Sequence, residues 1–341
     1  MSPRQLALTM GDPAGIGGEL ALKAWLGRGQ DGLRSFYLLD DPSRIFRLAD
    51  ALALEVGLKV IAHPSEANKI FNDSLPIFPL SQKVTAQPGN PDSSNAAATL
   101  QSIELAVAHC RDGLASAVVT NPISKEVLID AGFKHPGHTE FLAELAGGRQ
   151  EAIMMLACDQ LKVVPVTIHC ALRDAITQLS QEKILHAART TAEALIRDFG
   201  IENPRLVMAG LNPHAGENGK LGREELEIQI PAAEILRAEG IDIGNPLPAD
   251  SLFHESARSG FDAALCMYHD QALIPIKTID FESGVNVTLG LPFVRTSPDH
   301  GTAFGIAGKG IANKRSLVEA MKMAASMAER REAHQGFAED G

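Results

Sequence analysis

Three histidines occupy matching positions in the sequence, and their side chains are suited to binding a metal ion. His169, His214 and His269 each come shortly after an apolar run that has the pattern of a β-strand. Ligands of open α/β sheets bind beyond the carboxyl ends of the strands, so three imidazoles placed there could share one ion. Three protein ligands with one open position form a catalytic zinc site, and imidazole also suits other divalent metals. The alternative is three unrelated histidines, since no local spacing motif joins them.

Carboxylates and cations near these histidines extend the candidate site. Asp270 directly follows His269, and a metal-bound imidazole usually needs an acceptor for its second ring nitrogen. Lys277 and Arg295 flank Asn286 in an otherwise acidic protein. A phosphate ester needs such donors, with arginine as a fork and lysine as a point charge. Solvated surface cations are the alternative interpretation.

Two glycine-rich segments are candidates for nucleotide binding. The first, GDPAGIGGE at residues 11–19, lacks both the GxGxxG pattern and the lysine of a P-loop. A tight turn from strand to helix is therefore favoured there over a phosphate cradle. The second, DHGTAFGIAGKGIAN at residues 299–313, contains four glycines whose backbone donors could approach a nucleotide closely. A plain flexible loop is equally compatible with its composition.

The elements that would position these residues alternate between strands and helices. Continuous apolar runs, typical of strands covered on both faces of a mostly parallel sheet, predict six strands. They are residues 6–10, 36–39, 117–120, 163–168, 206–209 and 263–268. Pro165 indicates an edge or a bulge in the fourth of these strands. Helical spacing predicts one helix from a Ser180 cap to Gly200 and another over residues 316–327. This alternation predicts an α/β fold.

Composition excludes several classes of protein. The 341 residues fit two domains or one large α/β unit, and 45% hydrophobic residues exclude wholesale disorder. A net charge of −11 argues against a nucleic-acid or membrane-surface partner, although one basic cluster can still hold a small anion. Four cysteines without CxxC spacing indicate a reducing compartment. With neither a signal peptide nor a transmembrane run in the sequence, we expect a cytoplasmic protein.

The motifs that carry these residues resemble the 4-hydroxythreonine-4-phosphate dehydrogenase family of pyridoxal phosphate biosynthesis. The resemblance extends over residues 6–313, nearly the whole chain. Its motifs are TMGDPAGIG (9–17), TNPISK (120–125), PGHTEFLAELAG (136–147), IHCALRDA (168–175), GLNPHAGENGKLGREE (210–225), GNPLPADSLF (244–253), YHDQALIPIKT (268–278) and GVNVTLGLPFVRTSPDHGTAF (284–304). Long motifs in this order make the resemblance specific.

The resemblance assigns a role to each candidate residue. It implies that the divalent-metal ligands are His169, His214 and His269. The residues that it implies contact substrate are His138, Thr139, Lys277, Asn286 and Arg295. By similarity to the adenosine loop of isocitrate and isopropylmalate dehydrogenases, the cofactor residues would be Gly301, Thr302 and Gly308. Asp270 and Asp250 are the candidates for the catalytic proton acceptor.

The resemblance also implies a fold and an assembly. The fold would be the isocitrate/isopropylmalate-dehydrogenase-like α/β architecture, with two domains and a cleft between them. Residues 1–134 and 280–341 would form a discontinuous nucleotide-side domain, and residues 135–279 a domain that binds metal and forms the dimer. The protein would be a homodimer whose two subunits share each active site.

The implied reaction is a metal-assisted alcohol oxidation. NAD or NADP would oxidise 4-phosphooxy-L-threonine to a β-keto acid, which loses carbon dioxide to give 3-amino-2-oxopropyl phosphate. One divalent ion per subunit, zinc, magnesium or cobalt, would assist as a Lewis acid.

Other functions remain open on the sequence. The same scaffold serves dehydrogenases of 4-phosphorylated D-threonate or D-erythronate and of aromatic dihydrodiols, and the cations favour a phosphorylated substrate. A three-histidine metallohydrolase or lyase without a nucleotide, and a non-catalytic metal-dependent dimer, are the alternatives of a different class.

Overall fold

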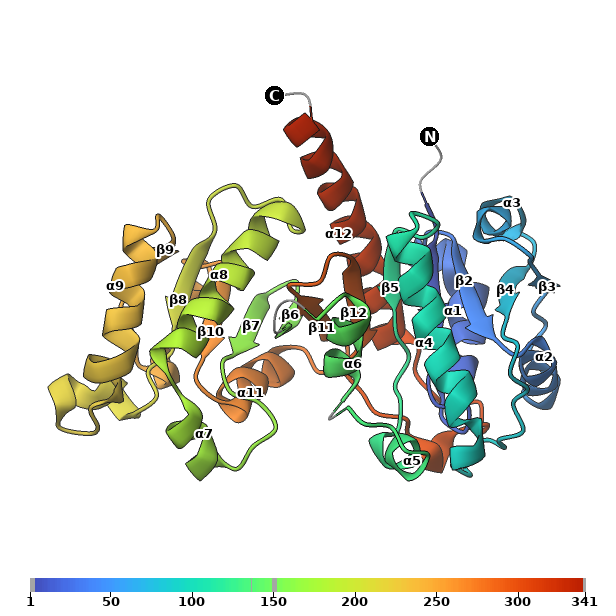
Figure 1. The fold of residues 1–341 in the computed structure, drawn as a ribbon, viewed down its shortest axis with the longest axis horizontal. Coiled ribbons are helices and arrows are strands. Elements are labelled where there is room, and N and C mark those ends of the chain that lie inside the picture. Colours follow the sequence, from blue (N-terminus) through green and yellow to red (C-terminus); the bar gives the residue numbers. More distant parts are fainter. Residues whose placement is uncertain (1–3, 136, 149–151, 340–341) are drawn as a thin grey trace. The chain divides into compact units, whose positions relative to one another are not determined.

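The computed structural model describes residues 4–135, 137–148 and 152–339, and the side chains of these up to residue 335. Pro136, the first residue of one family motif, lies outside the described residues. The chain divides into two compact units, Met1–Ala152 with Leu291–Glu329 and Ile153–Gly290 with Arg330–Gly341. Each unit contains a β-sheet with helices packed on it (Figure 1), so the predicted α/β class is confirmed. The functional labels of the predicted domains stay predictions.

The first unit contains a fully parallel set of strands. In order across the sheet they are β3 (Leu58–Val60), β4 (Leu75–Pro79), β2 (Phe36–Asp40), β1 (Leu6–Thr9), β5 (Ala117–Val119) and β12 (Val294–Pro298). Its helices are α1 (Gly17–Asp31), α2 (Pro42–Ala51), α3 (Ala67–Ile70), α4 (Ala96–Arg111), α5 (Lys125–Asp130) and α6 (His138–Leu145). Strands β1, β2, β5 and β12 are buried along their whole length. The sequences of β1, β2 and β5 are largely apolar, as burial on both faces requires.

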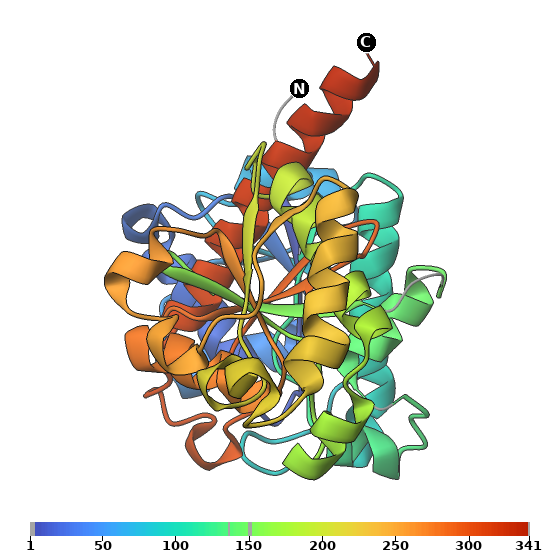
Figure 2. The same ribbon diagram turned by 90° about the vertical axis from the view of Figure 1, so that its left-hand side faces the viewer.

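The second unit contains a mixed set of strands. In order they are β11 (Val285–Leu289), β6 (Ile153–Cys158), β7 (Leu161–Pro165), β10 (Ala263–Cys266), β8 (Arg205–Met208) and β9 (Asp242–Ile243). Strand β6 runs antiparallel to both of its neighbours, and the others pair in parallel. Its helices are α7 (Leu172–Gln178), α8 (Gln181–Arg197), α9 (Ile230–Ala238), α10 (Glu255–Arg258) and α11 (His269–Ile279). Helices α8 and α9 pack on each other and on the strands, and α9 is the yellow helix of Figure 2.

All six predicted strands are present, four of them within one residue at each end and two with larger shifts. Strand β7 covers 161–165 rather than 163–168, and β10 ends at Cys266 rather than Tyr268. The prediction of an edge or bulge at Pro165 is wrong, because β7 lies between β6 and β10. Pro165 is tolerated as the last residue of its strand, where the N–H of Val166 donates to the carbonyl of Cys266 at 2.7 Å.

The two predicted helices are also present. Ser180 caps α8 by accepting a hydrogen bond from the N–H of Lys183, as predicted, and the helix ends at Arg197 before Gly200. The last helix, α12 (Arg315–Glu339), continues well beyond residue 327, where the prediction ended. Of the residues 328–335, six are exposed and four are charged, so the apolar pattern stops before the helix does. Within the described residues, no helix combines the length and apolar character that a membrane span needs. All four cysteines are free thiols.

A buried ion cluster ties α12 to α8 within the second unit. The carboxylate of Asp198, 1% exposed, accepts two hydrogen bonds from Arg331 at 2.6 and 2.7 Å and two from Arg197 at 2.9 Å each. Burial alone would raise the pKa of Asp198, but the two guanidinium groups outweigh it and lower the pKa below its ordinary value.

We therefore expect Asp198→Asn to lower the free energy of unfolding by about 3 kcal/mol at pH 7, because it leaves Arg331 without its buried counter-charge. A urea titration of both proteins would measure the difference. The wild-type advantage is fully present above the unfolded carboxyl's pKa of 3.8 and disappears as the pH falls through the lower folded pKa. Asp262→Asn, which breaks the more exposed pair with Arg205, is the control and should change stability by less than about 1 kcal/mol. Equal effects of the two variants would contradict this account.

Candidate metal and substrate site

The three strands that precede the candidate metal ligands are neighbours in the sheet. Their order is β7, β10, β8, and both pairings are parallel. Their carboxyl ends therefore lie at the same edge of the sheet. His169 follows β7, His269 begins α11 directly after β10, and His214 lies in the 3₁₀ segment η3 (Pro213–Gly219) after β8.

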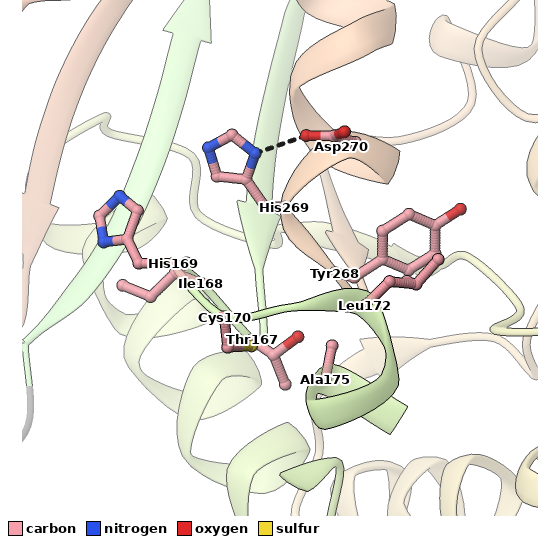
Figure 3. A pocket seen from close by; sticks show the side chains of 9 residues that line it. All are labelled: Thr167, Ile168, His169, Cys170, Leu172, Ala175, Tyr268, His269 and Asp270. Carbon is pink, nitrogen blue, oxygen red and sulfur yellow. Dashed lines mark hydrogen bonds and ion pairs between the residues drawn. The ribbon is translucent and has the colours of Figure 1, made fainter. Parts of the chain in front are cut away.

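Two of these histidines line one pocket. His169 and His269 lie with ring centroids 5.9 Å apart, in a cavity of about 240 Å³. Nδ1 of His269 is 2.7 Å from Oδ1 of Asp270. Figure 3 shows the two rings as neighbours, with Asp270 on the side of His269 away from His169. The other residues that line the cavity are Thr167, Ile168, Cys170, Leu172, Ala175 and Tyr268.

This pair fits a divalent metal ion. A ligating imidazole nitrogen lies about 2.1 Å from zinc, so two rings on one ion have centroids roughly 5–6 Å apart. Asp270 accepts at one ring nitrogen of His269 and leaves the other, Nε2, directed away from that bond. A carboxylate in this position is the usual partner of a metal-bound histidine. The donor set is therefore suitable for zinc, cobalt or a related ion.

The backbone at two of the candidate ligands is strained. His169 has φ 50°, and residues 214–218 all have φ between 45° and 77°, a short left-handed run. A non-glycine residue in this region costs about 1–2 kcal/mol. Such strain persists where the surrounding structure enforces it, and it concentrates at functional sites. The strain at both histidines is what we expect of residues held in place for binding.

The loop that carries His214 is fixed by two carboxylates. Glu225, 2% exposed, accepts from the N–H of Asn212 at 2.7 Å and from its side-chain amide at 2.9 Å, and Glu224 accepts from the same amide at 2.7 Å. A Cβ at Gly216 would lie 2.5 Å from the carboxylate of Glu225. Only glycine therefore fits where this loop approaches its support.

The structure does not bring His214 to the other two histidines. His214 is not among the residues that line their cavity. Within residues 4–135, 137–148 and 152–339, no three His, Cys, Asp or Glu side chains are placed to hold one ion. A single chain thus assembles two of the three predicted ligands, and the role of His214 stays a prediction.

Of the predicted substrate residues of the second unit, Lys277 lies near this pair. Lys277 lines a cavity of about 390 Å³ together with His269 and Asp270. Asn286 lies on β11, opposite Leu156 of β6. Asp250, the other candidate proton acceptor, is exposed on the short turn Ala249–Ser251.

In the first unit, two of the predicted substrate residues, Arg295 and His138, form a second polar group. His138 and Thr139 begin α6, and Arg295 lies on β12 with only 4% of its surface exposed. The hydroxyl of Thr120 accepts hydrogen bonds from Nε and Nη2 of Arg295 at 3.1 and 2.6 Å. Burial lowers the pKa of Arg295 to about 10, so the guanidinium keeps its charge at neutral pH.

His138 has an unsatisfied ring nitrogen beside this cation. Its Nε2 is enclosed and has no hydrogen-bond partner among the described residues. Burial, with the charge of Arg295 second, lowers the pKa of His138 well below its ordinary value. A neutral imidazole with a buried, unpaired nitrogen next to a buried guanidinium is suited to a polar, anionic ligand.

The predicted cofactor residues lie in a loop that α1 supports. The carbonyl of Thr302 accepts from the N–H of Ile16 at 3.1 Å, and Gly301 is exposed. Gly308 has φ 71° and packs so closely on Pro88 that a Cβ there would lie 2.7 Å from it. Residues 11–16 form the predicted turn between strand and helix, with α1 beginning at Gly17.

A match to a protein-family model identifies the family of the chain. The model described as "Pyridoxal phosphate biosynthetic protein PdxA" matches residues 35–324. The chain belongs to this family. The predicted resemblance is thereby confirmed.

Individual relatives agree with the PdxA assignment. A protein of Bradyrhizobium diazoefficiens named 4-hydroxythreonine-4-phosphate dehydrogenase is 54% identical, over 95% of this chain and 97% of its own. The crystal structure of 4-hydroxythreonine-4-phosphate dehydrogenase from Klebsiella pneumoniae is 35% identical with a TM-score of 0.86, over 95% of this chain and 99% of its own. A terephthalate 1,2-cis-dihydrodiol dehydrogenase of Burkholderia xenovorans LB400 is more distant, at 27% identity and a TM-score of 0.66, over 95% of this chain and 98% of its own.

Three buried residues next to predicted site residues, one in the first unit and two in the second, were not predicted from the sequence. Thr120 contacts Arg295, and Thr167 and Gln271 make hydrogen bonds behind the paired histidines. Each lies inside one of the motifs or directly before one, so position was the available signal. Their side chains are neutral and of ordinary type, which gives no chemical reason to select them.

Glu19 supports the loop next to the predicted cofactor residues. It is 1% exposed, accepts from the N–H of Ala312 at 2.9 Å and pairs with Lys23 at 2.8 Å. We expect Glu19→Gln to raise the KM for NAD(P) about tenfold by weakening these charged hydrogen bonds, and to leave the KM for the phosphorylated substrate unchanged. Steady-state kinetics with each substrate varied would measure this. Glu239→Gln, on a surface pair with Arg189, is the control. A parallel rise of both KM values would contradict a role confined to the cofactor loop.

Proposed function

We propose that this chain catalyses the NAD(P)-dependent oxidation of 4-phosphooxy-L-threonine, as the name of its 54% identical relative indicates. The product would be a β-keto acid that loses carbon dioxide to give 3-amino-2-oxopropyl phosphate. The observation that carries the proposal is the His169–His269 pair, with Asp270 as its acceptor, in a chain of the PdxA family.

The histidines would hold one divalent ion per subunit. The chemistry that such an ion supplies is Lewis-acid polarisation of the substrate hydroxyl, while the nicotinamide supplies the hydride acceptor. His169 and His269 are placed to bind the ion in one chain. We propose that His214 completes the set from a second subunit of a homodimer, since one chain alone does not bring it to the pair.

The other residues would bind and orient the phosphorylated substrate. Arg295 offers a buried, charged fork, and Lys277 a charge beside the histidine pair. His138 offers a neutral ring with an unpaired nitrogen. Asp270 would hold His269 in the orientation needed for binding. A proton acceptor is proposed among Asp270 and Asp250.

The alternative substrates are less well supported. The 4-phosphorylated sugar acids would undergo the same oxidation. However, the relative at 54% identity is named for the amino-acid substrate, 4-hydroxythreonine 4-phosphate. The dihydrodiol enzyme is only 27% identical. A metallohydrolase and a non-catalytic dimer both conflict with the dehydrogenase named in the relatives.

An absorbance assay at the NADH band would test the proposal. The purified protein is given 4-phosphooxy-L-threonine or D-erythronate 4-phosphate, with NAD or NADP, before and after treatment with a chelator. We expect turnover of the amino-acid substrate, its loss with chelator, and its recovery when zinc, cobalt or magnesium is added back. Equal rates on both substrates, or a rate that the chelator does not change, would contradict the proposal.

A further inference from the structure

We infer that Gln271 and Thr167 are positioning residues that fix the spacing of the three strand ends carrying His169, His214 and His269. Neither residue contacts the proposed ion, and the inference depends on the metal site of the proposed function. It rests on a chain of buried hydrogen bonds that joins β7, β10 and β8 beyond the last bonds of the sheet.

Gln271 joins the strand ends that precede His269 and His214. Its side chain is 7% exposed and points back from α11. Oε1 accepts from the N–H of Met267 at 2.6 Å, and Nε2 donates to the carbonyl of Gly210 at 2.7 Å. Met267 shortly precedes His269, and Gly210 shortly precedes His214. One amide thus sets the separation of these two loops.

Thr167 joins the strand end that precedes His169 to the same residue. Its hydroxyl, in a side chain 3% exposed, donates to the carbonyl of Met267 at 2.7 Å. Both backbone polar groups of Met267 are therefore bonded by side chains, one from Gln271 and one from Thr167. The three loops are connected through the peptide groups of a single residue.

These bonds are needed because the sheet stops before the histidines. Beyond β7 and β8, the last backbone bonds to β10 are Val166 N–H to Cys266 and Ala209 N–H to Leu265. Past this edge, the loops are joined to one another by the side chains described above. A second buried glutamine, Gln229, bonds Ala209 and Leu211 and so stabilises only the His214 loop itself.

The consequence concerns metal binding more than folding. Ligand groups must be held within about 0.5 Å of the binding geometry, and their supporting residues typically contribute 10- to 100-fold in metal affinity. Loss of either bond lets one histidine loop move independently of the others. In a shared site of a dimer the same requirement holds, because each chain then contributes ligands from these loops to two ions.

The test is a cobalt titration of the metal-free full-length protein, followed by its visible absorbance. Gln271→Met removes both bonds at similar volume, Thr167→Val removes the hydroxyl, and Thr167→Ser retains it. The control is Gln5→Met, which removes another buried amide and its 2.9 Å bond to the carbonyl of Leu114 in the first unit.

We expect Gln271→Met and Thr167→Val to bind cobalt at least tenfold more weakly than the wild type, and Thr167→Ser and Gln5→Met to bind as the wild type does. Thermal unfolding of the metal-free proteins separates weaker metal binding from a general loss of stability, because Gln5→Met should also lower Tm but leave cobalt affinity unchanged. Wild-type affinity in both Gln271→Met and Thr167→Val would overturn the inference. A wild type that binds no cobalt would instead overturn the metal site of the proposed function.

Discussion

Replacing His269 by alanine is expected to lower kcat/KM by about a thousandfold. The Lewis-acid contribution of a bound ion is several kcal/mol, and about 4 kcal/mol corresponds to three powers of ten in rate. His269 belongs to both cavities described above, and its ring lies 5.9 Å from that of His169. Its loss therefore removes one of the two proposed ligands that a single chain brings together.

The same substitution should leave the fold intact. The side chain of His269 is 37% exposed, so its removal leaves no core cavity. Thermal unfolding of the metal-free variant should match the wild type, while its affinity for cobalt falls. Asp270→Asn should cause a smaller loss of about 10- to 100-fold, because it alters the partner of the ring and retains the ring itself.

His334→Ala, at an exposed position of α12, is the control for His269→Ala and should keep full activity and metal affinity. Retention of cobalt affinity by His269→Ala would show that the ion binds elsewhere. Loss of activity with unchanged metal affinity would assign His269 to substrate contact alone.

The sequence predicts the central strands well because their chemistry is simple. Strands β1, β2, β5 and β10 are continuous apolar runs, and each lies buried as its pattern requires. Strand β12 was not predicted, because its buried sequence VRTSP contains Arg295, Thr296 and Ser297. Hydropathy alone cannot identify a strand whose buried side chains are polar.

The candidate site is predictable in type but only partly in arrangement. Histidines after strand ends indicate a shared sheet edge, and β7, β10 and β8 are indeed neighbours. Their order follows from crossovers that no local pattern encodes. The left-handed run at residues 214–218 also has no sequence signal, since four of its five residues are not glycine. Tertiary contacts with Glu225 enforce it.

The second large effect is expected at Arg295. Arg295→Met should lower kcat/KM for the phosphorylated substrate by about 100-fold, because a buried charge-assisted pair typically contributes 2–5 kcal/mol. Its guanidinium is the buried cation beside the unpaired nitrogen of His138. Most of the loss should appear in KM, because in the proposed function the fork binds the substrate and takes no part in the chemical step.

Smaller substitutions at this position separate charge from geometry. Arg295→Lys keeps the charge but loses the fork, so it should fall between the wild type and Arg295→Met. Thr120→Val removes the acceptor of two Arg295 hydrogen bonds and should raise KM about tenfold, while Thr120→Ser should restore it. Steady-state kinetics, together with competitive inhibition by inorganic phosphate, would measure the KM of each variant and its affinity for phosphate.

Arg205, which forms an exposed ion pair with Asp262, provides the control for the Arg295 variants. Arg205→Lys changes an arginine of the second unit that contacts only its own surface partners, and it should leave KM unchanged. If Arg295→Met also left KM and phosphate inhibition unchanged, the phosphate would not bind at the first-unit cluster, and Lys277, which lies beside His269, would be the next candidate. An increase in KM for Arg295→Met with no change for Lys277→Met would place the phosphate at Arg295. The reverse result would place it next to the metal ligands, so the two variants together locate the phosphate group of the substrate.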